Sequence, residues 1–394
     1  MCIIYKSQGA FGPLLGNKIH MKRGYLMSYL KKLFKNIDKS LYIVPFLLAI
    51  ISITMLLSIS EGEGNMFSRM VIVQSFSYIL GFIAVLIVAH MNLSILEDWT
   101  KPLYIFSVLF LFTPFIPGLG VEQYGAKSWI NLGITTFQPS EIVKLIFIIL
   151  MAVYLKEHSE ELRYFKGFCK AFLYAAPIIL IVLKEDFGSA AVFSVCFIAM
   201  VLYAGLDLKL FGRLVSAGCL AFPFAFKILD VYQQQRITGF LYPDDLSIQS
   251  VYQVWQAKTA IGSGGLIGKG LFNGTMKNFL PVKESDFIYA VICEELGFIG
   301  GCLVLILFTW FLISMTKLSF KINDSYGSLI VIGVVGMFAA QIFENIAMCM
   351  GFMPVTGITL PFLSYGGSSV LSNMLAISMV INIAISNRGI AFLK

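Results

Sequence analysis

The chain has 394 residues, of which 58% are hydrophobic and only 13% charged, and its mean hydropathy is +0.83. Soluble domains carry roughly 25% charged residues, so this composition excludes a soluble enzyme, a disordered chain and a disulfide-built secreted scaffold. The net charge is +7, but the basic residues do not gather on one soluble face, so we expect no nucleic-acid partner. The composition predicts an all-α polytopic membrane protein.

Residues 1–40 precede any apolar run and hold eight of the 29 Lys and Arg residues. We expect them to form a basic cytoplasmic tail near anionic lipid. Residues 41–388 are predicted to form one membrane domain, followed by a short cytoplasmic C-terminus at 389–394. About ten membrane-spanning helices are expected, at 41–59, 71–91, 102–117, 138–155, 169–183, 187–206, 210–229, 287–315, 327–347 and 366–386.

The distribution of Lys and Arg over the short loops predicts the orientation. Loops on one side are rich in both, whereas short loops on the other side hold only Arg69, Lys127 and Lys184. The positive-inside rule therefore places both termini in the cytoplasm. Three polar segments, 118–140, 230–286 and 348–368, then emerge together on the outer face, where long loops usually carry function. The third contains Pro354 and Pro361, and is predicted to be re-entrant or to line a cavity.

Ionisable residues inside or beside apolar runs are the next signal, because each one is costly in a membrane unless it is compensated. Glu141 and Lys144 share a helix face at i, i+3. They indicate either a structural ion pair or contact with an anionic head group, and the two roles are compatible. Glu294, Glu295 and Glu344 are interpreted as structural polar residues that pack against other helices.

Two further acidic residues lie at the ends of predicted spans. Asp286 is the last polar residue before an apolar run, where a partly buried carboxylate can act as a general base. A helix N-cap is the alternative, and position alone favours the cap. Lys184-Glu185-Asp186 is interpreted as an outer turn with solvated charges, and Asp186 as a structural polar residue.

The segment 261–270, here called the glycine-rich segment, does not match a P-loop, because it lacks the preceding strand and the Gly-Lys-Ser/Thr end. Its flexible glycines, with Lys258 and Lys269, suit contact with a lipid diphosphate instead. The three histidines are too few and too scattered for a metal site, so no metal ligands are assigned.

A set of short motifs follows in order along about residues 41–388. The motifs are Trp129-Ile130-Asn131-Leu132-Gly133, Gln138-Pro139-Ser140-Glu141 with Lys144, Asp186-Phe187-Gly188-Ser189-Ala190, Tyr252-Gln253 with Gln256, Gly262-Ser263-Gly264-Gly265, Gly268-Lys269-Gly270, Leu280-Pro281, Asp286-Phe287-Ile288-Tyr289-Ala290-Val291, Glu294-Glu295-Leu296-Gly297, and Pro354-Val355-Thr356-Gly357 through Ser369. Taken together, this ordered set resembles the SEDS family (shape, elongation, division and sporulation) of peptidoglycan polymerases. The glycine patterns and the short C-terminus resemble the RodA, or elongation, branch more than FtsW or a sporulation paralogue.

The resemblance implies a glycosyltransferase that polymerises lipid II into glycan strands on the outer face of a bacterial cytoplasmic membrane during cell elongation. Asp286 would be the general base, and undecaprenyl diphosphate would leave. The substrate-binding residues would be Glu141, Lys144, Arg236, Gln256, Lys258, Lys269, Ser285, Ser364 and Tyr365. No cofactor is required by the sequence, although Mg²⁺ or Mn²⁺ at the diphosphate is an open alternative. The partners would be the growing glycan strand, a class B penicillin-binding protein, and other elongation or division machinery.

The chain departs from the family pattern at several positions. Lys184-Glu185 stands where Gln-Pro is usual, with Phe187 for Leu, and Thr359 replaces a Pro. Glu284-Ser285 stands in place of His-Thr before Asp286, and the negative charge of Glu284 should favour protonation of Asp286. Two other functions compete with the polymerase: a lipid II flippase or other lipid transporter lined by buried charges, and a non-catalytic scaffold for a cell-wall synthase.

Overall fold

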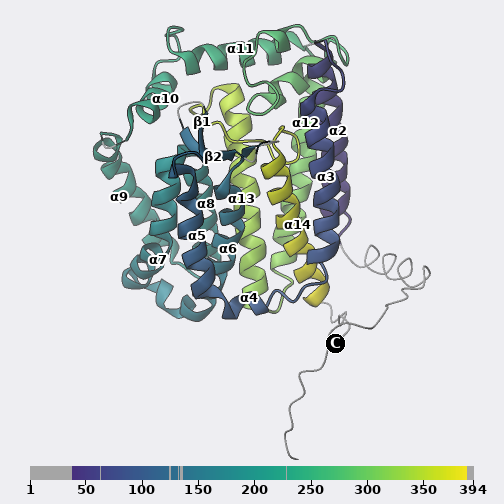
Figure 1. Cartoon of the computed structure of the whole chain (residues 1–394). Helices are drawn as coiled ribbons and strands as arrows, with labels where there is room; N and C mark the ends of the chain where they lie inside the picture. The colour runs from purple at the N-terminus through teal and green to yellow at the C-terminus, as the bar shows by residue number, and fades with distance from the viewer. Residues whose placement is uncertain are drawn as a thin grey trace, which may run out of the picture. The chain divides into compact units, whose positions relative to one another are not determined.

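The structure is a computed structural model that describes residues 38–387 except 63, 124–125, 132, 134–135 and 228. The predicted C-terminal segment 389–394, and all but the last three residues of the predicted basic tail, lie outside the described residues. Each of the ten predicted spans coincides with a helix (Figure 1). These helices are α2 (Ser40–Gly62), α3 (Arg69–Val88), α5 (Thr100–Leu111), α6 (Pro139–His158), α7 (Phe165–Glu185), α8 (Phe187–Tyr203), α9 (Leu208–Phe226), α12 (Ile288–Ser319), α13 (Ser325–Met350) and α14 (Gly367–Asn387).

Six of these helices are long and apolar enough to cross a membrane: α2, α3, α7, α12, α13 and α14. A membrane core of about 30 Å needs about 20 helical residues. Helix α8 is apolar but shorter, and α5 is extended by a 3₁₀ turn, η1 (Thr113–Phe115). The helical part of the fold prediction is therefore confirmed.

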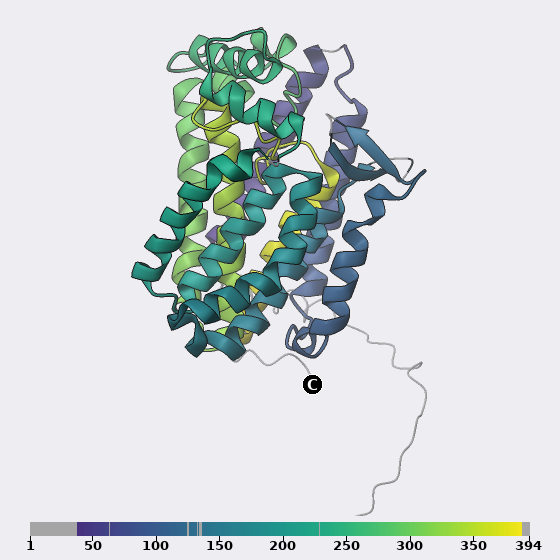
Figure 2. The same ribbon diagram turned by 90° about the vertical axis from the view of Figure 1, so that its left-hand side faces the viewer.

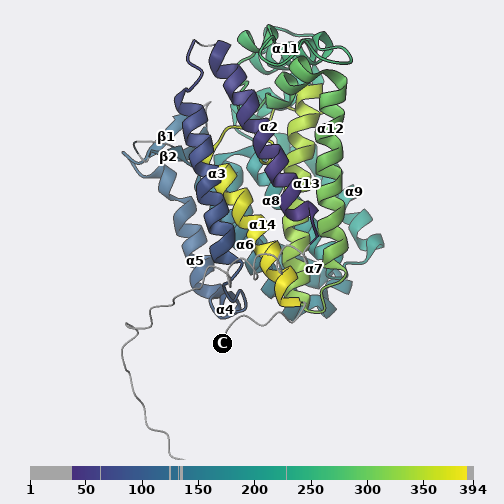
Figure 3. The ribbon, with the colours of Figure 1, turned by 90° about the vertical axis from the view of Figure 1, so that its right-hand side faces the viewer.

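Helices α13 and α14 form the centre of the bundle, and most of their residues are buried. Helix α2 packs along α12, and α3 packs along α14 (Figure 3). A glycine permits the close approach of α3 to α14, because small residues let helix backbones come together. A Cβ added at Gly81 of α3 would lie 2.6 Å from Met374 Cγ of α14.

One end of the bundle carries most of the irregular structure (Figures 1 and 2). There the predicted long loop 230–286 forms two helices, α10 (Val231–Leu241) and α11 (Gln249–Ser263), and a 3₁₀ turn, η3 (Met276–Asn278). A small antiparallel sheet, which the all-α prediction omitted, has the order β1 (Gly120–Gln123), β2 (Ala126–Asn131), β3 (Thr136–Phe137). The short helix α4 (Ile95–Asp98) lies at the opposite end, and a 3₁₀ turn, η2 (Ser159–Arg163), joins α6 to α7.

The glycine-rich segment packs against a break in α12. Gly297 has a φ of +68° inside that helix, and the backbone N–H of Lys269 donates to Glu294 O at 3.0 Å. A Cβ added at Gly268 would lie 2.1 Å from Glu295 O, so only glycine allows the two backbones to meet here. Backbone packing thus accounts for Gly268, and contact of the segment with a lipid diphosphate stays a prediction.

Candidate functional site

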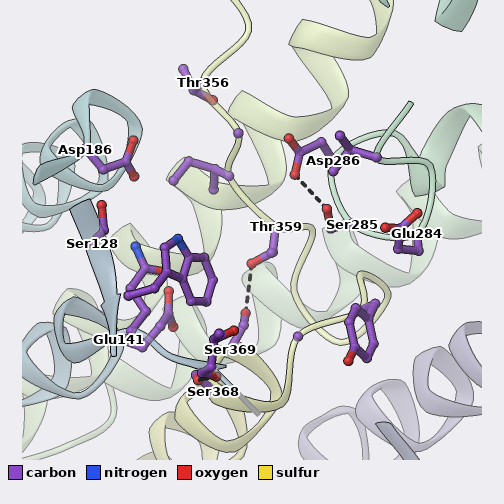
Figure 4. A pocket seen from close by; sticks show the side chains of 18 of the residues that line it. Ser128, Glu141, Asp186, Glu284, Ser285, Asp286, Thr356, Thr359, Ser368 and Ser369 are labelled. Carbon is purple, nitrogen blue, oxygen red and sulfur yellow. Dashed lines mark hydrogen bonds between the residues drawn. The ribbon is translucent and has the colours of Figure 1, made fainter. Parts of the chain in front are cut away.

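A polar cavity of about 210 Å³ lies between the sheet, α10 and the segment that precedes α14. We call it the carboxylate cavity, because four carboxylates from three separate parts of the chain line it (Figure 4). These are Glu141, Asp186, Glu284 and Asp286. Arg236 is the cation among its described lining residues. Hydroxyl groups fill much of the remaining wall, from Ser128, Ser285, Thr356, Thr359, Tyr365, Ser368 and Ser369.

The backbone of residues 284–286, just before α12, is fixed at three successive carbonyl oxygens. Each carbonyl accepts a hydrogen bond from a residue distant in sequence, at 2.5–2.8 Å. Since the segment cannot shift without breaking these bonds, the side chains of residues 284–286 are held in place. The donors, in order, are Tyr365 N, Ser364 Oγ and Asn345 Nδ2.

The Asp286 carboxylate faces the cavity instead of capping a helix. Helix α12 has Phe287 as its N-cap, and the Asp286 carboxylate accepts a hydrogen bond from Ser285 Oγ at 2.9 Å. The N-cap interpretation, which position alone favoured, is therefore wrong. The reason is tertiary: the turn before α12 directs the carboxylate toward the other cavity walls.

The environment of Asp286 raises its pKa from 3.8 to about 6. Burial is the largest cause, because a charged carboxylate loses solvation there. The hydrogen bond from Ser285 and the charge of Arg236 lower the pKa, whereas the charges of Glu284 and Asp186 raise it. A carboxyl group with a pKa near 6 is largely ionised at neutral pH and still basic enough to accept a proton.

Gly357 keeps open the space between Asp286 and Arg236. A Cβ added there would lie 3.6 Å from Asp286 Oδ2 and 3.8 Å from both terminal nitrogens of Arg236. Gly357 also has a φ of +76°, which side-chain-bearing residues rarely adopt. Arg236 is positioned by a 2.6 Å hydrogen bond from its Nη1 to Thr356 O. A base and a cation thus face one small volume.

The segment between α13 and α14 lines the cavity, as predicted for 348–368. Buried side chains of α2 and α3 hold its irregular backbone. Ser52 Oγ donates to Leu363 O at 2.7 Å, and Gln74 Nε2 donates to Ser364 O at 3.0 Å. Tyr78 OH donates to Phe362 O. These bonds satisfy carbonyls that no helix or sheet pairs.

The wall opposite Asp286 carries Asp186 and Glu141 (Figure 4). Asp186 caps α8, because its carboxylate accepts from the backbone N–H of Gly188 at 3.3 Å and of Ser189 at 2.9 Å. Its neighbour Glu185 is only 3% exposed. The interpretation of solvated charges is therefore wrong for Glu185, which is buried where α7 meets α8, whereas Lys184 is exposed and Asp186 is half-buried.

Glu141 and Lys144 form the expected ion pair, with 3.0 Å between Lys144 Nζ and Glu141 Oε1. The Lys144 side chain is 2% exposed, and Lys144 is not among the residues lining the cavity. Glu141 does line it, and its Oε2 is buried without a hydrogen-bond partner in the described part of the chain. Glu141 is thus the member of the pair that faces the cavity.

Several other predicted residues lie away from the carboxylate cavity. Lys269 pairs with Glu294 of α12 at 2.7 Å. Glu295 pairs with Lys277 at 2.7 Å and accepts from Ser58 Oγ of α2. Four more predicted residues occupy separate places: Gln256 is buried in α11, Lys258 lines a second cavity, Glu344 is buried in α13, and Ser364 is buried beside residue 285.

The cavity contains residues that the sequence analysis did not select. Trp129, Thr356, Thr359, Ser368 and Ser369 line it, and Thr359 and Ser369 are joined by a 2.8 Å hydrogen bond between their hydroxyl groups. Their only sequence signal was their membership of the motifs quoted above, because isolated Ser and Thr residues carry no spacing pattern.

The acidic side chains do not form a recognisable metal site. Asp186 and Asp286 lie on opposite walls (Figure 4). The described residues contain no group of three His, Cys, Asp or Glu side chains placed to hold a metal ion. A divalent cation at the diphosphate stays a prediction, and no step below passes through one.

The fold and this site define a polytopic membrane protein with a half-buried carboxylate and a guanidinium facing one cavity at one end of a helical bundle. The family model described as "Cell cycle protein", which groups FtsW, RodA and SpoVE, matches residues 38–389. The chain therefore belongs to the FtsW/RodA/SpoVE family, as the resemblance to SEDS proteins predicted.

Individual relatives agree with this membership. Stage V sporulation protein E of Bacillus subtilis (strain 168) is 35% identical over 77% of this chain and 84% of that protein. A probable peptidoglycan glycosyltransferase FtsW of Geobacter sp. (strain M18) is 32% identical over 81% of this chain and 87% of that protein. A relative named for sporulation and one named FtsW thus match at similar identity.

Two solved structures share the fold. One, described as "Structural coordination of polymerization and crosslinking by a peptidoglycan synthase complex", has a TM-score of 0.75 and covers 89% of this chain and 98% of its own. The other is the rod shape determining protein RodA of Thermus thermophilus, with a TM-score of 0.65, covering 89% of this chain and 97% of its own. Both are 24% identical to this chain.

Proposed function

We propose that this protein is a peptidoglycan glycosyltransferase that polymerises lipid II, with Asp286 as the general base. The observation that carries the proposal is the placement of the Asp286 carboxylate in the carboxylate cavity, with its pKa raised to about 6 and Arg236 facing the same volume. The names of the FtsW relatives support the reaction class.

In the proposed reaction, Asp286 removes the proton from the 4-hydroxyl of the acceptor sugar. That oxygen forms a bond to the anomeric carbon of the lipid-linked sugar of the growing strand. The bond from this carbon to the diphosphate breaks, its electron pair leaves with undecaprenyl diphosphate, and the anomeric centre inverts. A positioned base contributes about 10²–10⁴-fold to such a step. One carboxylate is sufficient because the leaving diphosphate is already a stable anion and, unlike a glycosidase leaving group, needs little acid assistance.

The proposal includes a location and partners. The cavity would lie on the outer face of the bacterial cytoplasmic membrane, with both termini in the cytoplasm, as the basic loops indicate. A class B penicillin-binding protein would supply crosslinking, and the similarity to a structure described as a peptidoglycan synthase complex supports such a partner. Elongation is the role that the RodA-like glycine patterns favour.

The flippase alternative relied on buried charges lining a path through the membrane. Glu294 accepts backbone hydrogen bonds from Thr275, Met276 and Lys277 at 2.7–3.0 Å. It therefore fastens a loop to α12, and this role explains its burial without transport. A scaffold, the remaining alternative, predicts that substitution of Asp286 has no effect on synthesis.

The test is polymerisation of labelled lipid II by the purified protein with its penicillin-binding partner, whose transpeptidase is blocked. Asp286→Asn removes the base with little change of shape, and we expect glycan ladders to disappear. Asp245→Asn is the matched control, because Asp245 is an exposed aspartate whose contact is with neighbouring Ser247. Equal ladders from Asp286→Asn and the parent would refute Asp286 as the base. No ladder from a folded parent complex would refute the polymerase.

A further inference from the structure

A second cavity adjoins the first and shares Arg236 with it. It measures about 70 Å³ and is formed by α10, α11 and the residues just after α13. Lys258 and Trp255 of α11 line it, together with Ser250 and apolar side chains. We call it the Lys258 cavity. A water needs about 10–15 Å³ of such space, so the cavity holds several waters, or a phosphoryl group in their place.

The two cavities differ in charge. The carboxylate cavity has four carboxylates and one guanidinium among its described lining residues. The described residues that line the Lys258 cavity include two cations, Arg236 and Lys258, and no carboxylate. Because like charges brought together cost several kcal/mol, a diphosphate is disfavoured among the carboxylates and favoured beside the two cations.

The other cations proposed for the diphosphate are already engaged. Lys144 is 2% exposed and pairs with Glu141, and Lys269 pairs with Glu294, whose side chain is fully buried. Lys258, in contrast, is exposed and crosses the end of α13, where its Nζ would lie 2.6 Å from a Cβ added at Gly351.

We infer that the Lys258 cavity is the subsite for the lipid-linked diphosphate, held by Lys258 and Arg236. This inference rests on the proposed function. Asp286 lines only the carboxylate cavity, Lys258 lines only the second, and Arg236 lines both. The base and the leaving diphosphate are thereby assigned to separate cavities that share Arg236.

Tryptophan fluorescence distinguishes the two cavities without depending on activity. Trp255 lines the Lys258 cavity and Trp129 lines the carboxylate cavity. Undecaprenyl diphosphate is titrated into the full-length protein in nanodiscs, with undecaprenol as the probe that has the tail but no phosphate. We expect a fluorescence change with the diphosphate alone, which Trp255→Phe abolishes and Trp129→Phe retains.

Lys258→Gln removes the charge and keeps a polar side chain of similar reach. It should weaken undecaprenyl diphosphate binding about 10-fold, the size of one charge-assisted hydrogen bond at the lower end of its range. The matched control Lys227→Gln, at an exposed lysine outside both cavities, should leave binding unchanged. Thermal unfolding of each variant establishes that the fold is retained.

Inorganic pyrophosphate is added as a competitor to identify the source of the diphosphate. If pyrophosphate displaces undecaprenyl diphosphate at equal concentration, the diphosphate alone is recognised. If pyrophosphate does not displace it, the lipid-linked form is required. Equal affinity in Lys258→Gln and parent, a response to undecaprenol, or a signal lost only in Trp129→Phe would overturn the inference. If undecaprenyl diphosphate binds at Lys258 but no glycan ladders form, the polymerase is refuted and the subsite is supported. If ladders form but binding does not depend on Lys258, the subsite is refuted and the polymerase is supported.

Discussion

Asn345 joins the two segments that meet at the candidate base. Its side chain is fully buried, and Nδ2 donates to both Asp286 O and Ile358 O at 2.8 Å. Asn345→Leu keeps a similar volume and removes both donors. A buried acceptor left unpaired costs about 1–3 kcal/mol. Cys349 Sγ stays 3.6 Å from Asp286 O as a weak donor, so we expect a total loss of stability of about 2–4 kcal/mol.

Asn345→Leu should also slow the reaction, because without the two hydrogen bonds Asp286 is no longer held against the segment around Ile358. The matched control is Asn382→Leu, near the C-terminal end of α14 and away from the cavity. There Asn382 Nδ2 donates to Val88 O at 2.8 Å and to Met91 O at 2.6 Å. Both variants should lower the midpoint of thermal unfolding by similar amounts. At a temperature where both are folded, only Asn345→Leu should lower kcat for lipid II polymerisation, by about 10-fold or more.

Two outcomes would refute this reasoning. An Asn345→Leu protein with parental stability would show that the two carbonyls do not depend on Asn345. An equal fall of kcat in both variants would show that lost stability alone, and not the position of Asp286, reduces the rate.

Two further predictions follow from the site and the fold. Because burial raises the pKa of Asp286 to about 6, and only the ionised form accepts a proton, the polymerisation rate should fall as the pH drops through that value. Glu284→Gln removes a charge that raises this pKa, so the midpoint of the pH–rate profile should move down; an upward move would contradict the assignment. Gly268→Ala places a Cβ 2.1 Å from Glu295 O at a φ of +82°, and should lower the unfolding midpoint clearly. Gly262→Ala, with open space around its Cβ position, should leave that midpoint nearly unchanged, and equal melting of the two proteins would count against the packing argument.

The sequence was sufficient to predict the helical bundle, because length and hydropathy alone determine which segments can cross a membrane. The ten predicted spans correspond to ten helices, and the segment around Pro354 and Pro361 lines a cavity as expected. The sheet at 120–137 was missed because its strands are two to six residues long, too short for a clear alternation of polar and apolar residues.

What the sequence left open was the partner of each charged residue. The sequence offered four equivalent candidates for binding a diphosphate: Lys144, Lys258, Lys269 and Arg236. The sequence around a basic residue does not show which carboxylate will contact it in the folded protein. Packing of distant helices separated them: Lys144 and Lys269 form ion pairs with Glu141 and Glu294, and Lys258 and Arg236 line a cavity whose described lining residues include no carboxylate. Likewise, position alone favoured a helix cap for Asp286, and only the contacts from α13 and the segment before α14 directed its carboxylate into a shared site. Burial and charge partners are properties of segments brought together in space, so the tertiary structure alone decided them.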